Sequence, residues 1–286
     1  MHTGQTLHFP PDRMIDTASG FHGLREVEHL RVASLFPSEI DAIAELILAK
    51  VMLGPTERIP LHVHPGHAEA IFVLRGEVVA QRERAEAQIR THGAAYFPAG
   101  VPHSVTALQT DTVFLMFYPR ANIGRDVASE LLTPDTDQSE WPNPNVVKST
   151  NPLWRWAVAE ESEPWIPTEP TKGLDLRVRI LFDPLRGSPD LEIGTGMQEP
   201  NRHYTIHRHA PAEFYYILGG RGTYYVGDGA YEVAEGSVLY VPPMMPHGAD
   251  SHDSYVNDFY VYGLDGSGDD YVWEALEPIY DLPRQQ

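Results

Sequence analysis

Two histidine pairs of the form His-x-His are the most informative chemical feature of this 286-residue sequence. They are His62 with His64 and His207 with His209. Side chains two positions apart on a β-strand lie on the same face of the sheet, so each pair directs two imidazoles into one space. Two imidazole nitrogens on one side of a sheet make half of a metal site.

Each histidine pair is followed by a glutamate and then by a third histidine. Glu69 and His103 follow the first pair, and Glu213 and His247 follow the second. Glu69 comes after a Pro-Gly turn, where the next antiparallel strand would begin beside the first. A turn-rich segment precedes His103, so we expect this histidine to close the set from across the fold. Three imidazoles and one carboxylate would then meet in each half of the chain.

This donor set predicts one divalent metal in each half. Three nitrogens and one oxygen suit Fe(II), Mn(II), Ni(II), Co(II) or Zn(II), and four protein ligands leave two octahedral positions for substrate, water or dioxygen. Catalytic zinc usually has three protein ligands, and structural zinc leaves no open position. We therefore expect a redox-capable or oxygen-binding metal, with Fe(II) favoured.

The two donor sets belong to an internal repeat, because the ligands and several glycines and prolines recur at offsets of 143 to 145 residues. Two copies of one domain are the economical interpretation. We predict an N-terminal arm at 1–35, a first domain at 36–120, an interdomain segment at 121–172 and a second domain at 173–286. The interdomain segment is rich in Pro and Trp. We expect it to be a strap packed across the domain interface, or alternatively a cover for an active-site mouth.

Short runs of β-branched and aromatic residues between turns predict a mostly β protein. The clearest predicted strands are 45–53, 70–74, 113–118, 214–218, 238–241 and 258–262. Two short segments, 127–132 and 271–282, are predicted as peripheral helices. The Gly-Thr-Gly sequence at 194–196 is too short for a dinucleotide-binding fingerprint, and we predict it to be a loop.

The ligands resemble the two motifs of the cupin family, and both motifs occur twice. The first motif is matched by Gly54, His62, His64, Glu69 and Gly76, and again by His207, His209, Glu213 and Gly220; the second is matched by Gly93, Pro98, Gly100 and His103, and again by Gly236, Pro242 and His247. Met244 replaces one motif glycine in the second half. The resemblance implies an all-β bicupin, with two tandem double-stranded β-helix (jelly-roll) barrels, a few peripheral helices and one metal per barrel.

Among bicupins, the flavonol-cleaving quercetinases are similar to this chain in keeping both complete ligand sets. The resemblance implies a dioxygenase acting with O2 on a small aromatic, enol or carbonyl substrate, with Glu69 or Glu213 accepting the substrate proton. The alternatives are a non-redox isomerase, lyase or hydrolase, an oxalate-decarboxylase-like enzyme, or a non-enzymatic binding protein. Relatives of oxalate decarboxylase carry an arginine three residues before the first ligand histidine, where this chain has Ile59 and Tyr204.

The strand alternation also predicts side chains that line the substrate pockets. Ile71 and Val73 should line the first pocket, and Tyr215, Asp258 and Tyr260 the second. The first pocket is therefore predicted to be more apolar than the second. An aromatic lining suits an aromatic or enol substrate better than a small dianion.

The composition excludes several classes of partner. The net charge of −19 disfavours nucleic acid, and the basic residues form no cluster that would bind an anionic membrane. The chain has no cysteine, which excludes disulfides and thiolate chemistry. No apolar run resembles a signal or membrane segment, so we expect a cytoplasmic protein with a small-molecule substrate. A homodimer is compatible with the sequence.

Overall fold

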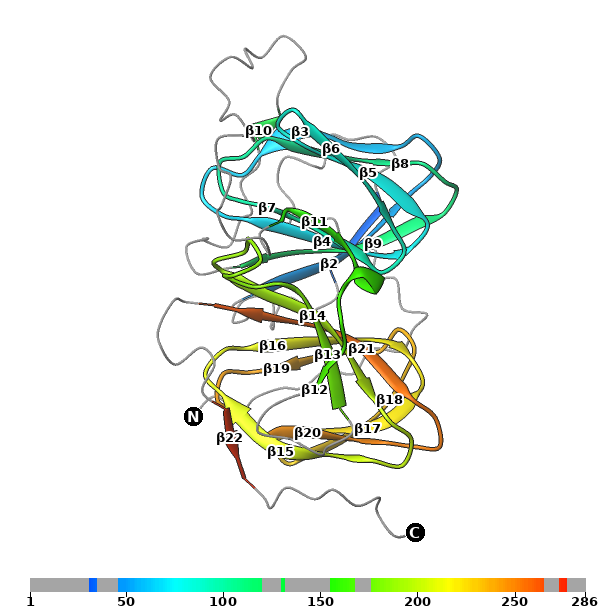
Figure 1. Cartoon of the computed structure of the whole chain (residues 1–286), viewed down its shortest axis with the longest axis vertical. Coiled ribbons are helices and arrows are strands. Elements are labelled where there is room, and N and C mark those ends of the chain that lie inside the picture. The colour runs from blue at the N-terminus through cyan, green and yellow to red at the C-terminus, as the bar shows by residue number, and fades with distance from the viewer. Residues whose placement is uncertain are drawn as a thin grey trace. The chain divides into compact units, whose positions relative to one another are not determined.

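The computed structural model describes residues 31–34, 46–119, 130–131, 155–167, 176–264 and 273–276. They fall into two compact units, which Figure 1 shows with their strands labelled. The first unit lies within residues 14–162 and includes 184–188, and the second lies within 163–183 and 189–286. Each unit holds one copy of the sequence repeat, and we call the two units the first and the second barrel.

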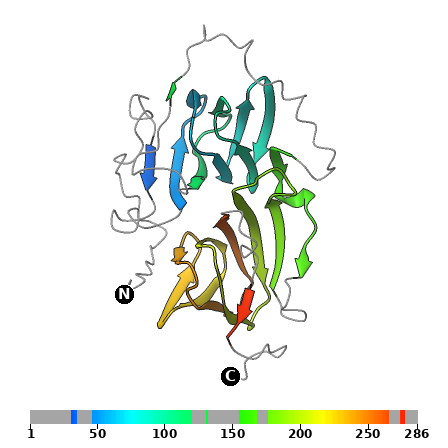
Figure 2. The same cartoon turned by 90° about the vertical axis from the view of Figure 1, so that its left-hand side faces the viewer.

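The first barrel consists of two antiparallel sheets. The six-stranded sheet has the order β1-β2-β9-β4-β7-β11, and the five-stranded sheet has the order β10-β3-β8-β5-β6. Figure 2 shows β1, in blue, beside β2 at the edge of its sheet. The strands are β1 (Arg31–Ser34), β2 (Leu46–Leu53), β3 (Arg58–Val63), β4 (Glu69–Arg75), β5 (Glu77–Arg82), β6 (Ala85–Arg90), β7 (Gly93–Phe97), β8 (His103–Ala107), β9 (Thr112–Pro119), β10 (Glu130–Leu131) and β11 (Ala157–Ala159).

The second barrel repeats this arrangement. Its six-stranded sheet has the order β12-β13-β14-β21-β16-β19, and its five-stranded sheet has the order β18-β17-β20-β15-β22. The strands are β12 (Ile166–Pro167), β13 (Leu176–Phe182), β14 (Leu191–Gln198), β15 (His203–His209), β16 (Glu213–Gly219), β17 (Arg221–Val226), β18 (Gly229–Ala234), β19 (Val238–Val241), β20 (His247–Ser251), β21 (Val256–Gly263) and β22 (Trp273–Ala275). Both barrels are therefore built from facing sheets, as the sequence predicts.

The two barrel interiors differ in chemistry. A cluster of sixteen buried hydrophobic residues fills the first barrel, and each of them is at most 3% exposed. The corresponding cluster of the second barrel has ten members, and three of these are tyrosines. The apolar core of the second barrel is therefore smaller than that of the first, and it carries more hydroxyl groups.

A β-bulge in one strand of each barrel sets the direction of the first histidine of the donor set. In the first barrel, the register between β3 and β8 shifts between Ile59 and His62, and this shift brings His62 opposite His103. In the second barrel, the register between β15 and β20 shifts between Tyr204 and His207. A β-bulge changes which face a following side chain points to, and it bends the strand locally. The two bulges thus place equivalent histidines in equivalent positions.

Three secondary-structure predictions are wrong in the described part of the chain. Glu130–Leu131 and Trp273–Ala275, inside the two predicted helices, are short edge strands. The rest of both predicted helices, apart from Leu276, lies outside the described residues. The only helical element among the described residues is the single 3-10 turn Glu160–Ser162. Residues 194–196 lie within β14 and form no loop. The peripheral segments pair with sheet edges, and this pairing overrides their weak helical pattern.

Two of the tryptophans in the interdomain segment can be placed. Trp156 packs against the core cluster of the first barrel, next to β11, which pairs with β7. Trp165 lies beneath the guanidinium of Arg179, whose Cζ is 4.2 Å from the ring centroid. Trp141 and Trp154 lie outside the described residues. Among the described residues, no helix is long and apolar enough to cross a membrane.

Candidate metal centres and the second-barrel cavity

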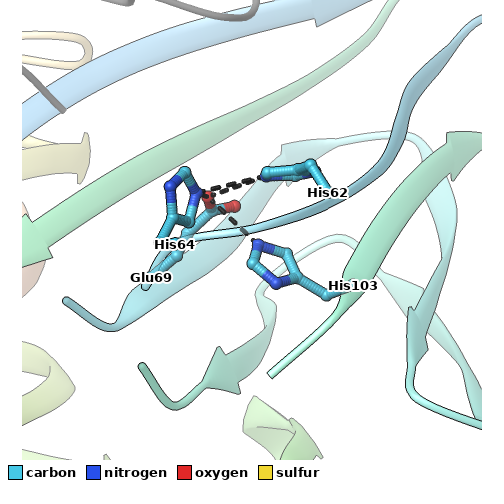
Figure 3. Close-up of side chains that lie close together, drawn as sticks. All are labelled: His62, His64, Glu69 and His103. Atoms are coloured by element: carbon cyan, nitrogen blue, oxygen red, sulfur yellow. Dashed lines mark hydrogen bonds and ion pairs between the residues drawn. The ribbon is translucent and has the colours of Figure 1, made fainter. Parts of the chain in front are cut away.

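The first centre brings together all four residues that the sequence predicts. His62 lies near the end of β3, His64 directly follows that strand, and Glu69 begins β4. His103 begins β8. One donor atom from each of the four lies within 4.8 Å of the others, and each residue is at most 1% exposed. Figure 3 shows the four side chains converging.

The hydrogen bonds of this centre prepare its nitrogens to bind a cation. Nδ1 of His62 lies 2.8 Å from the carbonyl oxygen of Pro60, and Nδ1 of His103 lies 2.8 Å from that of Val101. A carbonyl oxygen can only accept a hydrogen bond, so each ring carries its proton on Nδ1 and presents the lone pair of Nε2 to the centre. Nε2 of His103 and Oε1 of Glu69 make no hydrogen bond. The donor set therefore fits a divalent metal.

The electrostatics of the first centre favour the ligand forms of its residues. Burial alone would raise the pKa of Glu69, but the surrounding imidazoles, His103 foremost, hold that pKa well below its ordinary value. Burial, helped by the neighbouring His62, lowers the pKa of His103 to about 4, although Glu69 opposes the shift. At neutral pH the glutamate is thus ionised and this histidine is neutral, which are the states that coordinate a metal.

The second centre repeats the three histidines. His207, His209 and His247 lie within 4.8 Å of one another through their ring nitrogens, and all three are buried. Their Nδ1 atoms face the carbonyl oxygens of Thr205, Pro211 and Met245 at 2.8 to 2.9 Å. A metal could therefore be bound through the three Nε2 atoms, each ring keeping its proton on Nδ1; without a metal, Nε2 of His209 and of His247 faces Oε2 of Glu213.

Glu213 sits differently from Glu69. Its Oε2 lies 3.3 Å from Nε2 of His209 and 3.2 Å from Nε2 of His247. The same oxygen accepts a 2.6 Å hydrogen bond from the hydroxyl of Tyr215. Burial would raise the pKa of Glu213, but its hydrogen bonds to the two histidines lower it to about 2. Glu213 is therefore ionised and held by a tyrosine beside the three histidines, but it is not part of their donor cluster, and its role as a metal ligand stays a prediction.

A cavity of about 130 Å³ adjoins the second centre. Engineered cavities of similar size hold a benzene-sized ligand. Its wall includes metal ligands, three carboxylates and six tyrosines, and no lysine or arginine is among the lining residues. The ionisable and aromatic members are Glu192, Glu213, Asp258, His247, Tyr204, Tyr215, Tyr224, Tyr225, Tyr260 and Tyr262. Tyr215, Asp258 and Tyr260 were predicted to line a pocket, whereas Glu192 and Tyr224 were not.

Asp258 is an acidic side chain of this cavity whose pKa lies near neutrality. Burial raises the pKa of Asp258 to about 7, although a hydrogen bond from Tyr224 opposes the rise. The hydroxyl of Tyr224 donates that bond to Oδ2 at 2.6 Å. A group with a pKa near the working pH can both take and give a proton. Asp258 thus has the properties of a general acid or base.

Two glycines in β14 make room for the polar wall of the cavity. A Cβ atom at Gly196 would overlap Oδ1 of Asp258, and one at Gly194 would overlap the hydroxyl of Tyr260. Each glycine pairs in register with the residue whose side chain lies over it. The glycines therefore serve close packing inside a sheet, where an added side chain would push the wall residues away.

Ile71 and Val73, which the sequence assigns to the first pocket, are fully buried members of the core cluster of the first barrel. They pack with Phe114 and Met116, which lie opposite them on β9. The first interior is thus more apolar than the second, and the assignment of Ile71 and Val73 to a substrate pocket stays a prediction.

The motif pairs, the paired sheets and the two histidine centres define a bicupin. The cupin domain family model matches residues 49–118 and 195–254, one match in each barrel. The chain therefore has two cupin domains.

Solved structures of bicupins share this fold. The chain resembles the oxalate decarboxylase of Lactobacillus farciminis in a formate complex, with a TM-score of 0.68 and 18% identity over 96% of this chain and 90% of that one. It also resembles the oxalate decarboxylase of Bacillus subtilis, with a TM-score of 0.64 and 18% identity over 86% of this chain and 74% of that one. The Bacillus enzyme has Mn(II) centres. At this identity the likeness concerns the fold alone.

One characterised protein is similar in sequence. The chain is 34% identical over 82 residues to the dimethylsulfoniopropionate lyase DddW of Ruegeria pomeroyi. The match covers 28% of this chain and about half of the relative, 53% of its length. These comparisons favour the non-redox alternative over the dioxygenase that the resemblance to quercetinases implied: the similar proteins named above are oxalate decarboxylases and a lyase.

Proposed function

We propose that the protein is a metal-dependent lyase that works without redox change in the second barrel. The observation that carries this proposal is the single cavity shared by the metal ligands Glu213 and His247 and by Asp258. An elimination needs a proton acceptor and a leaving group, and a Lewis acid on the substrate carboxylate would assist it by acidifying the C–H bond. The second barrel supplies the proton acceptor and the site for the Lewis acid within a volume that fits a small molecule.

The roles of the residues follow from their states. A divalent metal held by the three histidines and Glu213 would act as a Lewis acid toward a carboxylate of the substrate and acidify the neighbouring C–H bond. Asp258 accepts that proton, a C=C bond forms, and the leaving group departs with its electron pair. Tyr224 holds Asp258 in place through its hydroxyl. Proton transfer by Glu69 or Glu213 stays a prediction, and their low pKa values suit a ligand better than a base.

The residues that line the cavity also indicate that the substrate carries a positive charge. Its tyrosine rings offer electron-rich faces, and its carboxylates add negative charge that no lysine or arginine of the lining offsets. Aromatic walls of this kind bind sulfonium and quaternary ammonium groups through cation–π interactions. A substrate with an onium group at one end and a carboxylate at the other would match both the cavity and the metal. The name of the sequence relative, a dimethylsulfoniopropionate lyase, is in line with this class.

Oxalate fits the second barrel less well. A dianion would meet three carboxylates and no cationic side chain. The position that holds an arginine in oxalate decarboxylases is Tyr204, which lines the cavity, and its counterpart in the first barrel is the buried Ile59. Decarboxylation of oxalate is therefore the second candidate, supported by the shared fold alone.

The test uses the purified protein loaded with Mn(II), without oxygen, and dimethylsulfoniopropionate as the probe. We expect dimethyl sulfide and acrylate in equal amounts, and the rate should fall by about 100-fold or more in Asp258→Asn. Asp253→Asn is the matched control, because Asp253 is exposed on the same barrel. Parallel assays measure formate from oxalate and oxygen consumption with flavonols. Product formation only from oxalate, or only with oxygen, would overturn the lyase proposal.

A further inference from the structure

We propose that the centre of the first barrel is a structural metal site, closed to substrate, whose ion stabilises the fold. This inference concerns a centre that the lyase proposal does not use. It rests on the packing around four ligands that are chemically equivalent to those of the second barrel. The two interiors can be compared residue by residue, because the strand registers of the barrels correspond.

The polar wall of the second cavity is replaced by apolar side chains in the first barrel. Equivalent cross-strand pairs identify the corresponding positions. With the second-barrel residue given first, they are Tyr204 and Ile59, Tyr215 and Ile71, Tyr224 and Ala80, Asp258 and Phe114, and Tyr260 and Met116. Every hydrogen-bonding group in this set is lost, including the proposed base. The first barrel therefore keeps the metal ligands and lacks the polar groups of these five positions, although the buried hydroxyl of Tyr118 stays beside Glu69.

The space beside the first centre is also occupied. Val51 pairs with Phe114 where Gly196 pairs with Asp258 in the second barrel. A β-branched side chain thus takes the place where the second barrel has a glycine. Both Val51 and Phe114 are fully buried in the core cluster. A substrate could reach this position only by displacing close-packed core residues.

Aromatic rings pack directly on the ligands of the first centre. The ring of Phe97 stacks on His103 with centroids 4.3 Å apart and planes within 8°. Tyr118 meets the ring of His64 edge-on at 5.3 Å. Phe97 and Tyr118 belong to the apolar core cluster, so the ligands are anchored in the same packed body that the strands form. Metal binding and core packing are coupled through these contacts.

The buried charge explains why the ion would stabilise the barrel. Glu69 is completely buried; its Oε2 lies 2.9 Å from Nε2 of His64, whereas its Oε1 has no hydrogen-bond partner. A buried carboxylate is costly unless a cation or a full set of hydrogen bonds compensates it. A metal bound only by the folded barrel raises stability by mass action. The first centre is therefore expected to act as a cross-link between β3, β4 and β8.

The experiment isolates the first centre by substitution. His207→Gln leaves the first centre intact, and adding His62→Gln to it disrupts both centres. We expect Mn(II) to raise the melting temperature of His207→Gln by about 5 °C or more and to leave that of the double variant His62→Gln/His207→Gln unchanged. His252→Gln, a substitution at a partly exposed histidine outside both centres, is the control. No rise in His207→Gln, or an equal rise in the double variant, would overturn the structural role.

Solvent access gives a second readout that requires no turnover. Mn(II) in the first centre of His207→Gln should relax water protons weakly, whereas wild-type protein should relax them strongly through its second centre. With Co(II), added acetate should leave the visible spectrum of His207→Gln unchanged and alter that of the wild type. Strong relaxation or an acetate-induced change in His207→Gln would overturn the closed site. Because the double variant is not needed here, the comparison stands if that variant fails to fold, and absence of lyase activity would not affect it.

Discussion

The hydroxyl of Tyr224 donates a 2.6 Å hydrogen bond to Oδ2 of Asp258 inside the second barrel. The two residues come from β17 and β21, in the two different sheets of that barrel, and both line the cavity beside Glu213. The bond stabilises the ionised form of a carboxylate that burial would otherwise keep protonated. Under the lyase proposal, this pair sets the pH at which Asp258 can accept a proton from the substrate.

Removing the Tyr224 hydroxyl should shift the pH dependence of turnover. If Asp258 is the base, kcat/KM rises as pH increases through the pKa of Asp258, about 7, and levels off above it. Tyr224→Phe removes the hydrogen bond that lowers this pKa, so its midpoint should move to higher pH. Tyr225→Phe is the control, because that hydroxyl bonds to Asp250 instead. A pH profile that stays in place in Tyr224→Phe would contradict the role of the pair.

Asp258 should also make the free energy of unfolding depend on pH. Its pKa is raised in the folded protein, so the folded state binds the proton more tightly than the unfolded state. The resulting stabilisation is complete below the ordinary aspartate pKa, about 4, and is lost as pH rises through about 7.

Urea unfolding of wild type and Asp258→Asn between pH 4.5 and pH 8 measures this effect. The free energy of unfolding of the wild type should fall relative to that of the variant over this range. Both proteins keep the same metal ligands, so their difference isolates Asp258. A difference that is constant with pH would show that the carboxylate is not held in a raised-pKa state.

The ligand sets could be predicted from the sequence because their spacing is local. His62 and His64 share a strand end, and Glu69 follows after one turn. Alternation along a strand and the turn signal suffice for these three residues. The third histidine, His103, could be placed because the same pattern recurs in the second half with His247.

The cavity wall could be predicted only in part, because it depends on pairing between distant strands. Tyr215 was found by counting two residues from Glu213, but Glu192 and Tyr224 lie on strands whose register the sequence does not reveal. The bulge between Tyr204 and His207 changes the parity of β15, and no local signal marks it. The two glycines at 194 and 196 looked like a loop because their partners, side chains on β21, are more than sixty residues away.

Gly196→Ala tests the close approach of β14 to Asp258. The added Cβ overlaps Oδ1 of Asp258, so the side chain or the strand must shift. We expect a loss of about 1 to 3 kcal/mol in the free energy of unfolding, which is typical of overpacking, together with a loss of activity. Gly219→Ala is the matched control, because a Cβ there meets no atom within 4 Å. Equal effects of the two substitutions would show that the cavity wall tolerates displacement.

Tyr215→Phe tests how the second centre holds its metal. The Tyr215 hydroxyl bonds to Oε2 of Glu213, and burial raises the pKa of this tyrosine well above its ordinary value, so the hydroxyl stays a donor at neutral pH. Hydrogen bonds that orient a metal ligand typically contribute 10- to 100-fold to affinity. We expect Tyr215→Phe to weaken Mn(II) binding at the second centre by about 10-fold.

The first centre serves as an internal reference for this measurement, because Ile71 stands where the second barrel has Tyr215 and offers no hydroxyl. Competition with a chelator should therefore show one weakened and one unchanged metal per chain. Tyr216→Phe is the control, since Tyr216 is the next residue of β16 and does not line the cavity. If both tyrosine variants bind two metals as tightly as the wild type does, the histidines alone position the Glu213 carboxylate. The two centres would then differ in the cavity beside them and not in how their ligands are held.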